Sequence, residues 1–384
     1  MRTCHVGAVN GARNGALDYA PARGPRVCHG YVWGGATVTI GARIHRLISA
    51  DMTASLPRIV VLATGGTIAG SSGSAASSAH YQAATVPVSQ LVQAVPVLAD
   101  VARIEAEQVA QVDSKDMMFS LWQQLAARVA HWSAQPDVAG IVITHGTDTL
   151  EETAMFLHLT QPTPVPLVMT AAMRPSTSLS ADGPLNLLDA VRVAASPAAR
   201  GKGVLVVLNQ QIHAARDVAK AHTSAVDAFV SPVAGPLGFV QDAYIRFTRA
   251  PLMVGGSYLP VPASWPMVEI VASYAQPGRV AVDALVSAGV KGLVVAAAGN
   301  GSVHETLAGA LADAAARGVA VVRSSRTGAG HVALPGKPAP TAGLFVSAAD
   351  LNPYKARVLL LLALAADSGL GADAARLQDV FARS

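Results

Sequence analysis

Cysteine is nearly absent from this chain of 384 residues. Its two cysteines, Cys4 and Cys28, both fall within the first 51 residues. The rest of the chain therefore has no means of forming a disulfide framework, a thiolate metal site or a cysteine nucleophile. Charged residues are also scarce, at 14% against 51% hydrophobic residues. Such a composition is typical of a chain that folds around a large core.

Long hydrophobic runs and a charge of one sign are missing as well. The densest apolar run is VLLLLALAA (358–366), whereas a helix needs about 20 residues to cross a bilayer. Of the 28 basic and 24 acidic side chains, six and two lie in residues 1–51, which leaves 22 of each in the rest. We therefore expect neither a membrane nor a nucleic acid as partner, because the body has no basic footprint.

The first 51 residues form a separate region that carries the whole formal net charge of +4. They contain no apolar stretch followed by a small-residue cleavage site, so no secretory signal is recognisable. Met52 opens a segment that reads like an ordinary cytoplasmic start. We expect residues 1–56 to be a leader, either disordered or upstream of the true start, and the protein to be cytoplasmic rather than periplasmic.

Several common catalytic and phosphate-binding motifs do not occur. There is no GxxxxGK[ST] loop, no GxSxG and no HExxH. Gly299-Asn300-Gly301 begins a dinucleotide fingerprint, but position 304 is histidine where a glycine is needed. These absences count against phosphate binding, serine hydrolysis and zinc-dependent proteolysis.

Alternating apolar strands and amphipathic helices are what the sequence does contain. Strands are expected at 59–63, 104–112 and 140–144, and a helix at 87–98 with Ser89 as a possible N-cap. The pattern predicts a larger N-terminal parallel-sheet α/β domain with helices on both faces, joined by a linker to a smaller C-terminal α/β domain. We place the three parts at 57–247, 248–266 and 267–384.

Hydroxyl and charged side chains follow three of the predicted strands. The strand ends read TGGT (64–67), DSKD (113–116) and HGTDT (145–149). Ligands of open α/β sheets bind beyond the carboxyl ends of strands, so these residues are expected to converge. The alternative is ordinary turn chemistry, in which Thr and Asp cap the following helices and Lys220 is a solvated surface lysine.

Four of these side chains could together support acyl transfer. A threonine hydroxyl attacks a carbonyl only if a base takes its proton and donors stabilise the oxyanion. Glycine-rich turns supply backbone donors, a lysine can supply the base, and an aspartate can hold that lysine. Thr67, Thr147, Asp148 and Lys220 are such a set, which indicates a threonine hydrolase.

The chain also resembles bacterial type II-like L-asparaginases of the asparaginase/glutaminase family, from about residue 57 to the C-terminus. The motifs that carry the resemblance are TGGTIAG, ITHGTDTLEETA, AMRPSTSLSADGP, ARDVAK, GNG, VVRSSR and LNPYKARVLL. It implies hydrolysis of L-asparagine, with L-glutamine as an alternative substrate, by a homotetramer of intimate dimers without a metal or an organic cofactor.

The resemblance also assigns residue roles. Thr67 is the expected nucleophile, although Thr147 is an alternative, and Tyr81 is a lid tyrosine that orients it. Thr147, Asp148 and Lys220 form the second catalytic group. Ser114 is expected to hold the substrate α-carboxylate, Asp148 the α-ammonium, and Asn300 to reach a neighbouring subunit's site. Substrate contacts are further implied for Gly66, Lys115 and Gly146.

Two positions depart from the family pattern. Lys115 stands where glutamine is common, and it either pairs with the α-carboxylate or points to solvent. The segment 327–343 contains no carboxylate, although many members have a glutamate there that bonds the lid tyrosine. A glutaminase and an amino-acid-binding sensor on the same fold remain alternatives. A tRNA-dependent amidotransferase subunit is disfavoured, because 51 leader residues are few for docking tRNA.

Overall fold

In a computed structural model of the protein, residues 56–76, 80–252, 258–334 and 343–384 are described. Residues 55–384 form one unit. The predicted leader lies outside the described residues apart from Leu56, and residues 253–257 and 335–342 lie outside them too.

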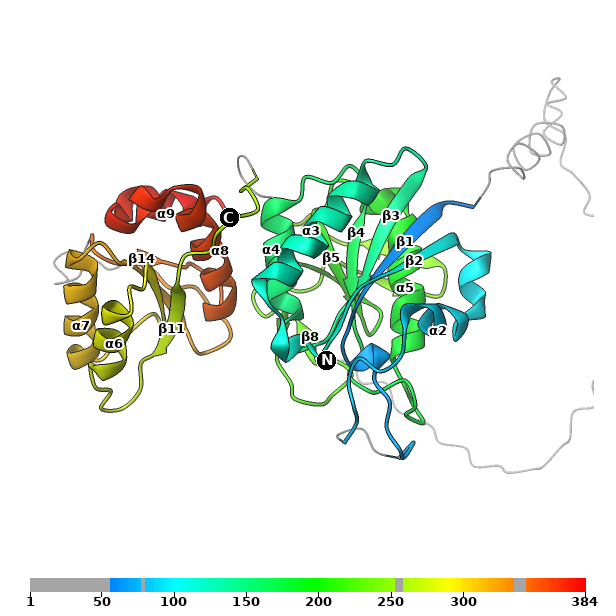
Figure 1. Ribbon diagram of the computed structural model, residues 1–384, viewed down its shortest axis with the longest axis horizontal. Helices are drawn as coiled ribbons and strands as arrows, with labels where there is room; N and C mark the ends of the chain where they lie inside the picture. The colour runs from blue at the N-terminus through cyan, green and yellow to red at the C-terminus, as the bar shows by residue number, and fades with distance from the viewer. Residues whose placement is uncertain (1–55, 77–79, 253–257, 335–342) are drawn as a thin grey trace, which may run out of the picture. The chain divides into compact units, whose positions relative to one another are not determined.

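A mixed eight-stranded sheet forms the larger, N-terminal domain (Figure 1). Its strand order is β10-β9-β6-β5-β4-β3-β1-β2, and the five strands from β5 to β2 run parallel. The remaining three, at one edge of the sheet, pair antiparallel, so the sheet is largely parallel, as predicted. The strands are β1 (Arg58–Gly65), β2 (Arg103–Val112), β3 (Val138–Thr144), β4 (Leu167–Thr170), β5 (Val204–Leu208), β6 (Gln211–Ala214), β9 (Gly238–Gln241) and β10 (Tyr244–Phe247).

Helices cover both faces of this sheet, as predicted. Alternate residues of β1 point to opposite faces, so that Val60 and Leu62 join one core and Val61 joins the other. The first core is formed with α3 and α4, the second with α2 and α5. These helices are α2 (Val88–Gln93), α3 (Phe119–Ser133), α4 (Leu150–Thr160) and α5 (Gly183–Ala195).

The smaller C-terminal domain contains a four-stranded parallel sheet with the order β11-β12-β13-β14. Helices α6 and α7 pack on one face and α8 on the other. The elements are β11 (Val268–Ala272), α6 (Val280–Ser287), β12 (Gly292–Ala297), α7 (Glu305–Ala316), β13 (Ala320–Ser325), β14 (Val346–Ser347), α8 (Pro353–Ala366) and α9 (Ala374–Ala382). The mixed α/β class and the two sheets agree with the predicted fold.

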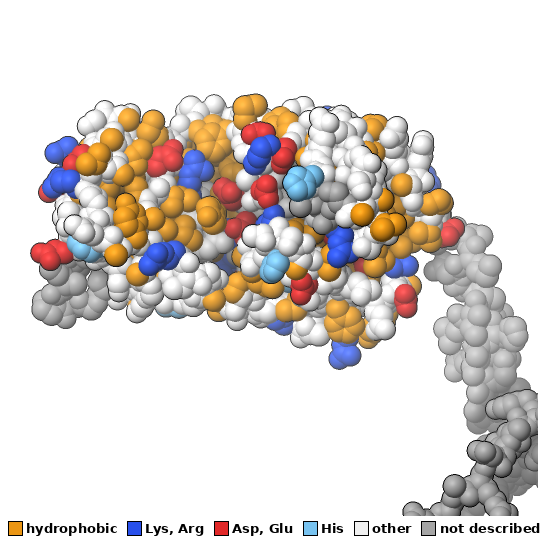
Figure 2. Space-filling model, turned by 90° about the horizontal axis from the view of Figure 1, so that it is seen from below, with side chains coloured by type: hydrophobic (Ala, Val, Ile, Leu, Met, Phe, Trp, Pro, Cys, Tyr) orange, Lys and Arg blue, Asp and Glu red, His pale blue; other side chains and the backbone are white. Residues whose placement is uncertain are grey.

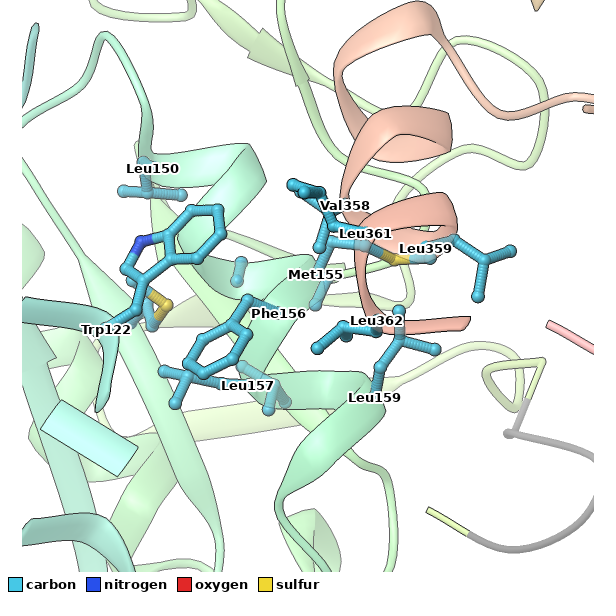
Figure 3. Packing of buried hydrophobic residues seen from close by; sticks show 14 of the residues in the cluster. Trp122, Leu150, Met155, Phe156, Leu157, Leu159, Val358, Leu359, Leu361 and Leu362 are labelled. Atoms are coloured by element: carbon cyan, nitrogen blue, oxygen red, sulfur yellow. The ribbon is translucent and has the colours of Figure 1, made fainter. Parts of the chain in front are cut away.

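Helix α8 also packs against α4 of the N-terminal domain (Figure 3). Val358, Leu361 and Leu362 share a core with Met155 and Leu159. The apolar run that is too short for a membrane is thus buried between the two domains. Among the described residues no helix is long and apolar enough to cross a bilayer.

Two local predictions were wrong, both near Pro96. The helix expected at 87–98 stops at Gln93, and a separate 3-10 helix begins at Pro96. Proline has no backbone N–H and its ring clashes with the preceding turn, so an α-helix does not continue through it. Ser89 is not the N-cap, because it lies inside α2 and Pro87 occupies that position.

The surface shown in Figure 2 carries both signs of charge. Lys and Arg side chains are interspersed with Asp and Glu side chains and with apolar side chains on that face. This agrees with the equal numbers of basic and acidic residues after position 51.

Candidate active site

The turn after β1 touches the turn after β3 through two glycines. A Cβ atom on Gly66 would lie 2.2 Å from the Gly146 Cα, and Gly66 has a φ of +79°. A Cβ on Gly146 would lie 2.5 Å from Ser114 Oγ. Only glycine fits such a close approach at a left-handed backbone. Gly66 and Gly146 thus bring the ends of β1, β2 and β3 together.

Thr67 is the first residue after this turn and faces Tyr81. Its Oγ1 lies 2.7 Å from the Tyr81 hydroxyl, and either oxygen can be the donor. Thr67 is buried, whereas Tyr81 is 36% exposed. Gln82, next to Tyr81, forms an antiparallel bridge with Ser71. Thr67 and Tyr81, expected to act together, are therefore in contact.

Lys220, Thr147 and Asp148 form a second group. Lys220 Nζ donates to Thr147 Oγ1 at 2.9 Å and to Asp148 Oδ1 at 2.6 Å. The Lys220 side chain is 19% exposed. The structure therefore does not support the alternative of a solvated surface lysine.

Ser114 links the end of β2 to this second group. Its Oγ accepts a hydrogen bond from the Asp148 backbone N–H at 3.1 Å, and its carbonyl accepts from Thr149 Oγ1 at 2.8 Å. Ser114 is buried. Among the described residues the Ser114 hydroxyl donates no hydrogen bond, so its hydrogen can be donated to a ligand.

Lys115 is held by the carboxylates of its own turn. Its Nζ donates to Asp113 at 2.9 Å and to Asp116 at 3.0 Å, and its side chain is 60% exposed. The hydrogen bonds to Asp113 and Asp116 raise the pKa of Lys115. This geometry favours the solvent-facing interpretation of Lys115 over a contact with the substrate.

The threonine hydroxyls at the strand ends are not used for helix capping. Thr149 occupies the N-cap position of α4 but makes no side-chain capping bond. Its hydroxyl donates instead to the Ser114 carbonyl after β2, and the Thr64 hydroxyl donates to the Thr144 carbonyl at the end of β3. The capping alternative therefore does not account for these two threonines, although the Asp113 side chain does cap the 3-10 helix at Ser114–Asp116.

Asn300 stands apart from the Thr67 group. It lies in the C-terminal domain on the turn after β12, and its Oδ1 accepts a hydrogen bond from the Ala333 N–H at 2.7 Å. No hydrogen bond among the described residues connects it to Thr67 or Lys220. Within one chain the structure thus does not bring Asn300 into the predicted site.

Three polar residues close to Lys220 were not predicted as site residues: Glu151 and Lys355, which are buried, and Asn352, which is half-buried. Glu151 Oε2 accepts from the Lys220 backbone N–H at 3.1 Å, and Asn352 donates to Glu151 Oε1 at 3.2 Å. Lys355 is 2% exposed and donates to two carbonyls just before Lys220. The sequence signals were present in LEETA and LNPYK, but spacing alone does not show that these segments meet.

No metal-binding cluster is found in the part of the chain that the structure describes, where no three His, Cys, Asp or Glu side chains are grouped to hold an ion. The chemistry available at the site is that of its hydroxyls, its lysine and its carboxylate. Fold and site together define a two-domain α/β enzyme whose candidate site lies at the carboxyl ends of β1, β2 and β3, beside Lys220 on the short strand β7 (Ala219–Lys220).

Comparison with known proteins identifies the family. Residues 58–253 match the family model described as "Asparaginase, N-terminal", and residues 267–381 match "Glutaminase/Asparaginase C-terminal domain". The chain belongs to the asparaginase/glutaminase family.

Three relatives illustrate this membership. The chain is 46% identical to "Glutaminase-asparaginase" of Pseudomonas fluorescens over 80% of this chain and 86% of that protein. It is 45% identical to "L-asparaginase 2" of Escherichia coli over 81% and 89%. A crystal structure titled a probable cytoplasmic L-asparaginase, from Campylobacter jejuni, matches with a TM-score of 0.80 at 42% identity, over 85% of this chain and 100% of that one.

Proposed function

We propose that this enzyme hydrolyses the side-chain amide of L-asparagine to L-aspartate and ammonia. The observation that carries the proposal is the 2.7 Å contact between Thr67 Oγ1 and the Tyr81 hydroxyl. It lies at a strand end beside the group of Lys220, Thr147 and Asp148. Relatives named L-asparaginase support the choice of reaction.

In the proposed first step, Thr67 Oγ1 attacks the side-chain amide carbon of the substrate. The Thr67 proton passes to the Tyr81 oxygen as the C–O bond forms, and Tyr81 gives its own phenolic proton to the amide nitrogen. The C–N bond then breaks, ammonia leaves, and an ester of Thr67 remains. In the second step water attacks this ester, which releases aspartate and restores the Thr67 hydroxyl.

Thr147 and Lys220 are proposed to assist both steps. Because Lys220 Nζ donates to Thr147 Oγ1, the hydroxyl hydrogen of Thr147 points elsewhere and is available to the substrate or to water. Asp148 holds the ammonium of Lys220 in place. This pairing supports Thr67 as the attacking residue and Thr147 as a proton relay.

The substrate's α-carboxylate and α-ammonium are proposed to bind Ser114 and Asp148 respectively, both at the carboxyl edge of the large sheet. Ser114 offers a free hydroxyl hydrogen to the carboxylate, since its Oγ already accepts from Asp148 N. The Asp148 carboxylate, half exposed, faces outward to the ammonium. Gly66 and Gly146, whose close contact brings the strand ends together, are proposed to face the substrate through their backbone groups.

We further propose that the active form is a homotetramer built from intimate dimers. Asn300, which the resemblance assigns to the substrate, lies on the turn after β12 and has no hydrogen bond to the Thr67 group within the described part of its own chain. A neighbouring subunit's Asn300 would complete the site. Sedimentation velocity tests this directly: a monomer that retains full asparaginase activity contradicts it.

The protein is proposed to act in the cytoplasm. The structural neighbour from Campylobacter jejuni is titled cytoplasmic, whereas a relative from Haemophilus influenzae is named periplasmic. Cell fractionation with marker enzymes separates the two locations.

The test of the proposed reaction is ammonia release from purified protein with asparagine and glutamine in parallel, together with quantification of the amino-acid product. We expect one aspartate per ammonia, and a preference for asparagine of about tenfold in kcat/KM, the value of one methylene in a shaped pocket. Faster turnover of glutamine would show a glutaminase, and binding without ammonia release would show a sensor.

A further inference from the structure

Lys220 stands on a poorly supported piece of backbone. It ends strand β7 (Ala219–Lys220), which among the described strands pairs with β8 (Phe229–Val230) alone and is not part of the large sheet. Two-residue strands contribute little rigidity of their own. The position of the Lys220 ammonium must therefore be fixed by contacts from other elements.

The segment 147–151, which leads into α4, contacts Lys220 both at its side-chain ammonium and at its backbone N–H. Just before the helix, Thr147 and Asp148 bind the ammonium. Within the first turn, Glu151 Oε2 accepts the Lys220 backbone N–H at 3.1 Å. Glu151 is 7% exposed, so this bond is shielded from water. One short segment thus sets the distance between Lys220 and the Thr147 hydroxyl.

The C-terminal domain completes this support through the start of α8. Asn352 donates to Glu151 Oε1 at 3.2 Å and also caps α8 by accepting from the Lys355 N–H at 3.0 Å. Lys355 Nζ donates to the Arg216 carbonyl at 2.8 Å and to the Val218 carbonyl. Both carbonyls belong to the backbone that leads into Lys220.

Holding these charges inside the protein is unfavourable. Burial raises the pKa of Glu151, and it lowers the pKa of Lys355 to about 8. The groups that face Lys355 include Arg216, Asp217 and Asp350 besides Glu151. Well-packed apolar side chains often stabilise a fold as well as a buried ion pair does. A role beyond stability would explain why Glu151 and Lys355, rather than apolar residues, occupy these buried positions.

We propose that Glu151 and Lys355 are positioning residues for Lys220, through which α8 of the C-terminal domain fixes the catalytic lysine against Thr147. The proposal rests on the proposed function, because it takes Lys220 to be part of the catalytic machinery. Glu151 fixes the backbone of Lys220 itself, and Lys355 fixes the two peptide groups that precede it.

The test compares Glu151→Ala, Glu151→Gln and Lys355→Met with the wild type in steady-state asparagine hydrolysis. Glu151→Ala and Lys355→Met should lower kcat by about 10- to 100-fold, the effect of a misplacement of the order of 1 Å. KM should change by less than about twofold, because the groups proposed to bind substrate are untouched. Glu151→Gln keeps an oxygen for the Lys220 N–H and should recover most of the lost kcat.

A matched control is Asp189→Asn, which changes another buried carboxylate, on α5 beside Arg192. Its kcat should equal that of the wild type. If Lys355→Met does not fold, the comparison of Glu151→Ala with Glu151→Gln still tests the positioning role. Equal kcat for wild type and Glu151→Ala overturns the proposal, and so does a loss that Glu151→Gln does not recover.

Combination with Lys220→Met separates this inference from the proposed function. If Glu151 acts through Lys220, then Glu151→Ala should lower kcat no further, within about threefold, once Lys220 is already methionine. A further full loss in the double variant overturns the positioning role. Wild-type turnover by Lys220→Met alone contradicts the proposed function instead, since it removes the catalytic lysine from the mechanism.

Discussion

Gly66→Ala is the substitution whose effect follows most directly from the geometry of the site. The added Cβ would lie 2.2 Å from Gly146 Cα, 2.4 Å from Gly146 N and 2.8 Å from the His145 carbonyl carbon. All three are backbone atoms, so no side chain can turn aside to make room. The turn that carries Thr67 and the turn that carries Thr147 must therefore separate.

The size of that separation gives the magnitude of the effect. The closest contact is about 1.2 Å short of the 3.4 Å at which ordinary van der Waals contact begins. A displacement of about 1 Å in a catalytic site lowers the rate by about 10²-fold. Alanine at the φ of +79° and ψ of −169° of Gly66 adds about 1–3 kcal/mol of backbone strain, because this region is essentially restricted to glycine. We therefore expect kcat/KM for asparagine to fall at least about 100-fold.

Gly309→Ala is the matched control, because Gly309 lies in α7 with no atom near its Cβ position. It should leave kcat/KM unchanged and raise stability by about 0.5–1 kcal/mol, the difference between alanine and glycine within a helix. Ammonia release and urea unfolding measure the two effects. A Gly66→Ala enzyme with kcat/KM within a few-fold of wild type would refute the contact between the two turns as the basis of the site.

Two further predictions concern ionisable groups. Lys115→Gln should leave KM for asparagine and glutamine nearly unchanged, because Lys115 pairs with Asp113 and Asp116; a joint rise in KM would place Lys115 on the substrate. Burial lowers the pKa of His158 to about 4 from an ordinary 6.5. As the pH falls between these two values, the unfolded chain binds a proton at His158 and the folded chain does not. The free energy of unfolding therefore drops by about 1.4 kcal/mol per pH unit between pH 6.5 and about 4. His158→Asn keeps an acceptor for the Val204 N–H and should reduce that slope in urea unfolding at fixed protein concentration. An unchanged slope would mean that the pKa of His158 is the same in the folded and unfolded states.

Local sequence patterns were sufficient for the parts of the site that lie at strand ends. The continuous apolar run before Thr64 predicts a buried strand, and parallel strands bring their carboxyl ends to one edge. That is why the turns with Thr67, Ser114 and Thr147 could be placed together before the structure was known. The contact between Tyr81 and Thr67 came instead from the family resemblance.

Contacts between distant segments could not be predicted in this way. Glu151 and Asn352 are 201 positions apart, and Glu151 reads in the sequence as an ordinary acidic residue at a helix start. Lys355 reads as a surface lysine, yet it is fully buried against the Arg216 carbonyl. Only the packing of α8 against α4 brings these groups to Lys220. The antiparallel strands β6, β9 and β10 were missed because alternation between strand and helix predicts parallel neighbours.

The central claim is that the Thr67 hydroxyl forms the covalent bond to the substrate, and Thr67→Val tests it most directly. Valine keeps the shape of this buried side chain and removes only its oxygen. With circular dichroism and assembly unchanged, kcat for ammonia release from asparagine should fall by at least about 10³-fold, as for other enzymes that lose a nucleophile. A Thr67→Val enzyme that releases ammonia at a near-normal rate would contradict the account.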